Sequence, residues 1–274
     1  MSGRILALGG HEFNRREGNE AIVDAIVELA DSNHPRICLL PTASGDMHDQ
    51  ISNFHRSFGE RDCHPSSISL FRLGIDPIDV REHLMAQDVI YAGGGSMVNL
   101  IAIWRAHGLD RILREAWEEG ILICGQSAGA MCWFEHGITS SSGEPAPAEG
   151  LRLLPGSACV HYLSEPERRK RFMAEIGAGA MPDGLGLEDQ TGVLFEGARI
   201  AESFVAREGA AVWSVESGGN GNGAAHEERL DSRRLEDKAL TASESLSSEI
   251  LEFRETLAAR TASIRTRRGV GRLD

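Results

Sequence analysis

Five short apolar runs of strand length recur through the first half of the chain, at residues 4–8, 36–40, 67–71, 88–92 and 121–124. The segments between them have helical spacing. Ile22 and Ile26 fall on one helical face, and residues 97–106 and 110–117 behave alike. Strands that alternate with helices form a parallel sheet, and strands that are apolar on both sides are covered by helices on both faces. We therefore predict an α/β fold, a three-layer α/β/α sandwich around a mainly parallel sheet.

Glycines follow three of these runs, as Gly9-Gly10, as Gly93-Gly94-Gly95 and as Gly125. In parallel α/β sheets, ligands bind in the crevice outside the carboxyl ends of the strands. We therefore expect the three glycine sites to border one crevice.

The second half of the chain has a different organisation. Short β-like pieces at residues 192–195, 199–202 and 210–215 predict hairpins at the edge of the sheet. We assign residues 1–217 to the main α/β domain, residues 218–225 to a Gly/Asn-rich linker, and residues 226–274 to a charged tail that is partly helical or disordered.

The net charge of the chain disfavours two classes of binding partner. The chain has 28 Lys plus Arg against 41 Asp plus Glu, a net charge of −13, so its field repels nucleic acid and anionic membranes. An acidic substrate then needs a local cationic pocket. The histidines form no cluster with metal-ligand spacing, so we expect no metal and no cofactor. The sequence leaves a homodimer open.

The five cysteines are odd in number, show no CxxC spacing and lie mostly in apolar runs. They predict buried, reduced thiols. The first residues lack the long apolar stretch of a signal peptide, so we expect a cytoplasmic protein.

The most informative segment is Gly125-Gln126-Ser127-Ala128-Gly129, which follows an apolar strand and precedes a run of small apolar residues. A nucleophilic serine at a strand-to-helix turn needs glycine or small neighbours because its backbone is strained, and the helix that follows offers a positive dipole end. This context predicts Ser127 as a nucleophile rather than a residue of a tight structural turn.

Backbone N–H groups near Ser127 can form an oxyanion hole. Gly93-Gly94-Gly95 ends the preceding strand, and no Gly-Lys-Ser/Thr follows that would indicate a phosphate loop. We predict Gly95 and Ala128 as the donors.

A nucleophilic serine also needs a base within hydrogen-bond reach. His136, His161 and His226 come after it in the chain. His161 is the preferred base because it ends another short β-like run, whereas His136 lies on a polar segment and His226 lies beyond the linker.

In combination, these motifs resemble the dipeptidase E and cyanophycinase-related serine peptidases, also described as type 1 glutamine amidotransferase-like proteins. The resemblance spans about residues 4–215 and rests on five motifs: Leu8-Gly-Gly-His-Glu-Phe13, Leu40-Pro-Thr-Ala-Ser44, Ala92-Gly-Gly-Gly-Ser96, Gly125-Gln-Ser-Ala-Gly-Ala130, and His161-Tyr162 with its follower Glu167-Arg-Arg-Lys-Arg171. It implies a flavodoxin-like sheet, Ser127 as nucleophile and His161 as base. It also implies hydrolysis of a small peptide or amide, which in the best-known members follows an N-terminal aspartate.

The chain departs from the family at the third member of the triad. In the family that it resembles, an acid lies shortly after the helix that follows the nucleophilic serine, whereas Ser140 stands there in this sequence. Three interpretations stay open: Glu144 supplies the carboxylate, Ser140 orients His161 as a neutral acceptor, or the enzyme is weak or inactive.

Two further groups of charged residues lie near these motifs. Arg168 and Arg171 follow the base at helical spacing and are candidates for holding a carboxylate, although a solvated helix face has the same pattern. Glu188-Asp189 could supply another carboxylate to the crevice, although a turn or a helix cap is the more usual origin of such a pair.

Two other functions remain as alternatives to a serine peptidase. The first is a catalytically impaired, amidotransferase-like binding module, which the missing acid favours. The second is an esterase of the α/β-hydrolase type with the order Ser127, Asp189, His226.

Overall fold

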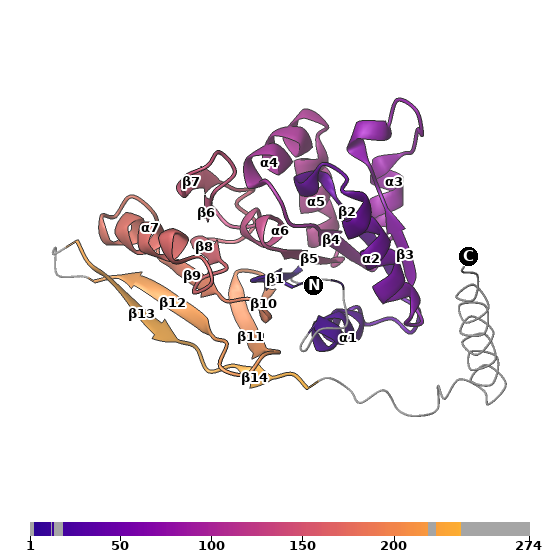
Figure 1. The fold of residues 1–274 in the computed structure, drawn as a ribbon. Helices are drawn as coiled ribbons and strands as arrows, with labels where there is room; N and C mark the ends of the chain where they lie inside the picture. The colour runs from indigo at the N-terminus through magenta and orange to yellow at the C-terminus, as the bar shows by residue number, and fades with distance from the viewer. Residues whose placement is uncertain (1–2, 12, 14–18, 219–222, 237–274) are drawn as a thin grey trace, which may run out of the picture. The chain divides into compact units, whose positions relative to one another are not determined.

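The computed structural model describes residues 3–11, 13, 19–218 and 223–236, and all structural statements below concern these residues. Its larger sheet has eight strands (Figure 1). Their spatial order is β14 (Arg233–Arg234), β11 (Arg199–Val205), β10 (Thr191–Glu196), β1 (Arg4–Leu8), β5 (Leu122–Gln126), β4 (Val89–Ala92), β2 (Arg36–Leu40) and β3 (His64–Ser67). The five strands from β1 to β3 in this order are parallel.

Helices cover both faces of this sheet, which confirms the predicted α/β sandwich. Successive residues of β1 face opposite ways: Leu6 and Leu8 pack with α1 (Asn19–Leu29) and α2 (His48–Gly59). Ile5 and Ala7 belong to the cluster on the opposite side. That side is covered by α3 (Val80–Met85), α4 (Met97–Ala106), α5 (Leu109–Glu118) and α6 (Ala128–Met131). Figure 1 shows α1 and α4 on opposite sides of the sheet.

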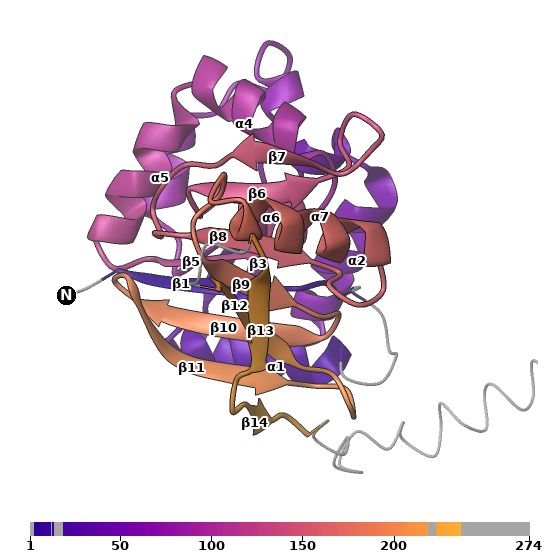
Figure 2. The same cartoon turned by 90° about the vertical axis from the view of Figure 1, so that its left-hand side faces the viewer.

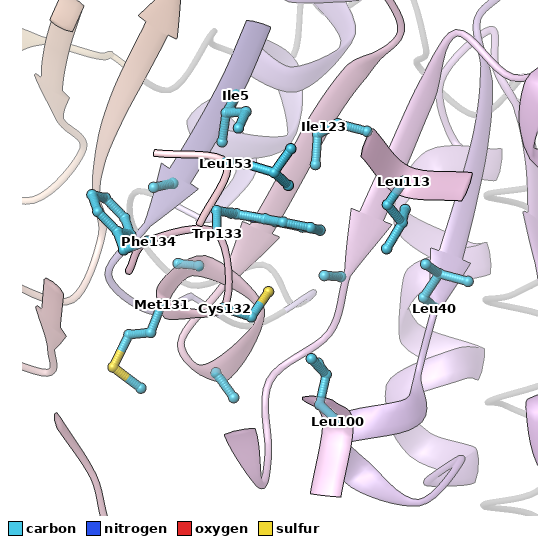
Figure 3. Close-up of a cluster of buried hydrophobic side chains, with 14 of the residues drawn as sticks. Ile5, Leu40, Leu100, Leu113, Ile123, Met131, Cys132, Trp133, Phe134 and Leu153 are labelled. Carbon is cyan, nitrogen blue, oxygen red and sulfur yellow. The ribbon is translucent and has the colours of Figure 1, made fainter. Parts of the chain in front are cut away.

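The core beneath α6 is the largest apolar cluster. Trp133, just after α6, is fully buried and lies beside Leu153 and Ile123 (Figure 3). The centroid of its ring lies 5.7 Å from that of Trp104, which is on α4. Burying aromatic rings of this size contributes strongly to stability, so this cluster fixes α6 against the sheet.

A second sheet of six strands lies beside the first. Its spatial order is β13 (Ala225–Arg229), β12 (Val212–Ser217), β9 (Gly184–Leu187), β8 (Ser157–Val160), β6 (His136–Thr139) and β7 (Ala146–Glu149). Helix α7 (Pro166–Gly177) packs on it through Phe172 and Ile176, and Figures 1 and 2 show β12 and β13 next to each other near α7.

Four of the five predicted strands match observed ones, and the prediction of a strand at residues 67–71 is wrong. The observed strand β3 covers His64–Ser67, and residues 70–72 form a 3-10 helix, as do residues 42–44. Because β3 is an edge strand and only partly buried, it has no apolar run of its own. The apolar residues that suggested the strand, Ile68 and Leu70, pack into the core after it ends.

The structure also corrects the expected end of the domain at residue 217. Strand β13 pairs with β12, and β14 pairs with β11, so the two sheets continue to Arg234. The predicted hairpin of β10 and β11 is present, with the two-residue strand β14 outside it at the sheet edge, whereas β12 belongs to the second sheet. The tail predicted for residues 226–274 lies outside the described residues from 237 onward.

The cysteines are all unpaired. Cys38, Cys124, Cys132 and Cys159 are buried, as expected, and Cys63 is half-buried. No helix among the described residues is long and apolar enough to cross a membrane.

The carboxyl ends of the neighbouring strands β1, β5 and β4 lie level with one another. Leu8 pairs with Gln126, and Ala92 pairs with Gly125. The three glycine sites after these strands therefore lie along one edge of the sheet, with Ser127 between them.

Candidate active site

Ser127 occupies the sharp turn between β5 and α6. Its backbone has φ 52° and ψ −119°, a region that costs a non-glycine residue about 1–3 kcal/mol, and its N–H donates to Leu8 O over 3.1 Å. Gly125 and Gly129 cannot be replaced without clashes: a β carbon on Gly125 would lie 2.2 Å from Gly129 O, and one on Gly129 would lie 2.2 Å from Ala92 O. The Gly-x-Ser-x-Gly spacing is therefore what allows this strand, turn and helix to pack together.

His161 meets Ser127 from the second sheet. It directly follows β8 and also has a left-handed backbone, with φ 56°. Its Nε2 atom lies 2.9 Å from Ser127 Oγ. The structure thus brings together the serine and the histidine that the sequence singled out.

Asp189 is the carboxylate at His161. Its Oδ1 lies 2.5 Å from His161 Nδ1, and its Oδ2 accepts a hydrogen bond of 2.7 Å from Ser164 Oγ. Burial alone would raise the pKa of the Asp189 carboxyl, but the hydrogen bonds from His161 and Ser164 outweigh it and hold this pKa below its ordinary value. Asp189 is therefore an anion at neutral pH.

The assignment of Glu144 as third member is corrected by this geometry. Glu144 is exposed in the turn between β6 and β7. Ser140 does not orient His161 either, because its Oγ accepts a hydrogen bond from Arg168 Nε at 3.1 Å. Both residues lie in the turn of the hairpin that β6 forms with β7, and neither has a hydrogen bond to His161 in the described part of the chain.

The sequence offers Glu188-Asp189 as a carboxylate pair for the crevice and Asp189 as the acid of the esterase order, but a turn or cap is the more usual origin of such a pair, and Asp189 is not predicted as the partner of His161. The signal that could have identified it is its position after the Gly-Leu-Gly-Leu strand. Since β9 runs parallel to β8, with Val160 opposite Leu187, the carboxyl ends of both strands reach the same edge. His161 directly follows β8 and Asp189 comes two residues after β9, so the two residues lie next to each other.

The other candidate bases lie elsewhere. His136 begins β6 with its Nδ1 buried and without a hydrogen-bond partner in the described part of the chain. His226 is exposed on β13. Neither contacts Ser127 in the described part of the chain.

Two backbone amides next to Ser127 have free N–H groups. Among the described residues, neither the Gly95 nor the Ala128 amide donates a hydrogen bond. Gly94 places this loop against the serine, since a β carbon there would lie 3.3 Å from Ser127 Cβ. Gly95 has φ 145°, and a β carbon on it would lie 2.2 Å from Ala43 O, so only glycine fits. The loop is suited to bind an oxyanion.

Gly10, after β1, lies against the side chains of His161 and Asp189. A β carbon at this position would lie 2.6 Å from both Asp189 Oδ1 and His161 Cε1. A β carbon on the neighbouring Gly9 would lie even closer to the backbone, 2.0 Å from Glu188 O. The Gly-Gly pair after β1 therefore leaves the space that His161 and Asp189 occupy.

The two predicted cationic residues already have partners on or near α7. Arg168 is largely buried and contacts Glu165 at 2.7 Å as well as Ser140. Arg171 pairs with Glu175 at 2.5 Å and is half-exposed. In the described part of the chain, neither guanidinium contacts Ser127, His161 or Asp189.

Comparison with known proteins gives a family match over most of the chain. The sequence model described as "Peptidase family S51" matches residues 5–203. The chain is 38% identical over 212 residues to "Uncharacterized peptidase YgaJ" of Bacillus subtilis (strain 168), which covers 77% of this chain and 91% of that protein. It is 26% identical over 206 residues to a cyanophycinase of Synechococcus elongatus, covering 71% of this chain but only 63% of that relative.

Two solved structures share the fold. A peptidase from an acI-B1 Actinobacterium has a TM-score of 0.64 at 17% identity, covering 85% of this chain and 95% of that one. A putative peptidase E from Listeria monocytogenes EGD-e has a TM-score of 0.54 at 14% identity, covering 84% of this chain and all of that one. At these identities the similarity concerns the fold alone.

Proposed function

The chain belongs to peptidase family S51, and on that premise we propose that it hydrolyses a small peptide or amide through an acyl-enzyme on Ser127. The observation that carries the proposal is the continuous chain of hydrogen bonds from Ser127 Oγ through His161 to Asp189. Serine, imidazole and carboxylate in this order form the triad that activates a serine for acyl transfer.

Each residue has a role that follows from its geometry. Nε2 of His161 accepts the proton of Ser127 as Oγ attacks the carbonyl carbon of the substrate. Asp189 keeps the other ring nitrogen protonated and stabilises the imidazolium. The imidazolium then gives its proton to the leaving amine, and a water molecule, deprotonated by the same imidazole, releases the acid from Ser127.

The negative oxygen of the tetrahedral intermediate lies, in this proposal, at the amides of Gly95 and Ala128. The tight packing of Gly95 on Ala43 fixes the direction of its N–H before the substrate arrives. A preorganised donor of this kind is worth about 3 kcal/mol of barrier.

For the substrate we propose a short peptide with an N-terminal aspartate, as the family resemblance implies. With a net charge of −13, the protein needs a local cation to hold such a side chain. Arg168 is the candidate, because it lies on α7, the helix that follows His161; its guanidinium contacts Glu165 and Ser140, and a substrate carboxylate would compete with Glu165 for it. Arg171 is a second candidate on the same helix.

Hydrolysis of Asp-X dipeptides and Asp-p-nitroanilide tests this proposal against the matching Leu-X compounds and an ester panel. We expect turnover of Asp-X that is absent in Ser127→Ala. Equal turnover of Leu-X and Asp-X contradicts the aspartyl preference, and turnover of esters alone contradicts the peptidase.

The two alternatives lose their main support. The binding module rested on a missing acid, yet Asp189 stands at His161. The esterase order needed His226 beside Asp189, whereas His226 is exposed on β13 and Asp189 bonds to His161.

A further inference from the structure

Strands β12 and β13 lie beyond residue 203, where the match to the family model ends. They nevertheless contact residues that adjoin His161 and Asp189 in the chain. Trp213 Nε1 on β12 donates to Glu188 Oε1 at 2.9 Å, next to Asp189. Glu227 on β13 accepts a hydrogen bond from Tyr162, next to His161.

Tyr162 is the anchor of the segment that carries His161. Its side chain is fully buried, and its N–H donates to Leu187 O at 3.2 Å. Its ring packs beside those of Phe172 and Trp213, with centroids 6.3 and 6.2 Å away. Burial raises the pKa of its hydroxyl well above the ordinary value, and the hydroxyl therefore stays protonated and donates.

Glu227 connects Tyr162 to helix α7 through hydrogen bonds. Its Oε2 accepts from Tyr162 Oη at 2.6 Å and from Arg169 Nε at 3.1 Å, and its Oε1 accepts from the same guanidinium. The Arg169 guanidinium also lies 5.6 Å from the centre of the Tyr162 ring. The Glu227 side chain is only 17% exposed. Losing it would leave the buried Tyr162 hydroxyl with only a weak sulfur acceptor, Met173 Sδ at 3.4 Å.

We propose that Glu227 is a positioning residue, which holds the His161 ring at Ser127 by fixing Tyr162. The backbone of His161 is in a strained left-handed conformation, with φ 56°, that persists only while its surroundings hold it. If Tyr162 is released, His161 relaxes and its Nε2 moves from Ser127 Oγ. This inference rests on the proposed function, because it assigns Glu227 a role through His161.

The test is the rate at which a fluorophosphonate probe labels Ser127, resolved into the maximal rate kinact and the probe affinity KI. A misplacement of about 1 Å can lower a rate about 100-fold. We expect Glu227→Ala and Tyr162→Phe each to lower kinact by about 10-fold or more with KI unchanged. Glu227→Gln, which keeps an acceptor for the tyrosine, should stay within about twofold of wild type. Glu228→Ala, an exposed neighbour on the same strand, is the matched control and should leave kinact unchanged.

The double variant Tyr162→Phe/Glu227→Ala decides whether Glu227 acts through Tyr162. Residues that act through one contact are non-additive, so the double variant should label no more slowly than Glu227→Ala. Additive losses overturn the inference, as does an equal loss in Glu227→Gln, which would assign the effect to the ion pair with Arg169. A fall in melting temperature with unchanged kinact also overturns it, because the role is then only structural. If wild type itself is not labelled, the proposed function fails instead.

Discussion

The Nδ1 atom of His161 lies 2.5 Å from Oδ1 of Asp189, and the other oxygen of the carboxylate accepts a hydrogen bond from Ser164. Both carboxylate oxygens are thus engaged, and the imidazole can turn only by breaking a charge-assisted bond. Asp189 thus supplies a carboxylate at His161, although Ser140 stands where the family resemblance implies an acid.

Asp189→Asn should therefore abolish most of the activity. The amide can no longer hold the imidazole in its tautomer or stabilise the imidazolium, and in a well-studied triad the equivalent change lowers kcat about 10⁴-fold. Steady-state kinetics on the best peptide of the panel measure the loss. Glu144→Gln is the matched control, since Glu144 is exposed in a turn, and it should behave as wild type. Comparable losses in both variants would refute the assignment.

Ser140→Asp should bring no gain. Were the triad lacking an acid, an aspartate at this position would restore activity. Ser140 instead contacts Arg168, and Asp189 already holds His161. We expect kcat to remain within about twofold of wild type, because no catalytic contact is added. A marked rise in kcat would mean that Asp189 does not act on His161 during turnover.

Gly10→Ala should damage the site without touching a reacting atom. The added methyl would lie 2.6 Å from Asp189 Oδ1 and His161 Cε1, so one of the two side chains must move. A displacement near 1 Å costs about 100-fold, and we expect kcat to fall by about that factor. Gly74→Ala is the control, because nothing lies within 4 Å of its added carbon. Unchanged kcat in Gly10→Ala would show that the pair tolerates displacement.

The lowered pKa of Asp189 predicts a pH-dependent contribution to stability. A carboxyl whose folded pKa is depressed stabilises the fold above its unfolded pKa of about 4, and this stabilisation is lost as pH falls through the lower folded pKa. The melting temperature of wild type should therefore exceed that of Asp189→Asn by a constant amount from about pH 7 to 5. The difference should shrink below about pH 4. A difference that stays constant down to pH 2 would contradict the ionised carboxylate.

The parts of the site that local sequence determines were predictable. The turn at Ser127 requires glycines at fixed positions on either side, and apolar runs mark β1, β2, β4 and β5 because both faces of these strands are buried. Helix α4 was expected at residues 97–106 and is found there, with Ser96 as its N-cap.

The remaining features depend on pairing between distant segments. Asp189 reaches His161 only because β9 pairs with β8 in parallel, and a sequence of four residues, Gly-Leu-Gly-Leu, does not specify its partner. Strand β13 is mostly exposed and has the polar sequence Ala-His-Glu-Glu-Arg, so no alternation of apolar residues marks it as a strand. Its strand conformation comes from pairing with β12, which no local propensity encodes.

The central claim is that Ser127 is a nucleophile activated by His161, and covalent labelling tests it most directly. Wild-type protein is treated with a fluorophosphonate, and the modified residue is identified by mass spectrometry of the digested chain. The account predicts a single adduct on Ser127, no adduct in Ser127→Ala, and labelling slowed by orders of magnitude in His161→Ala while that variant remains folded. Folded wild-type protein that stays unlabelled, or an adduct on Ser127 that forms equally fast without His161, would contradict it.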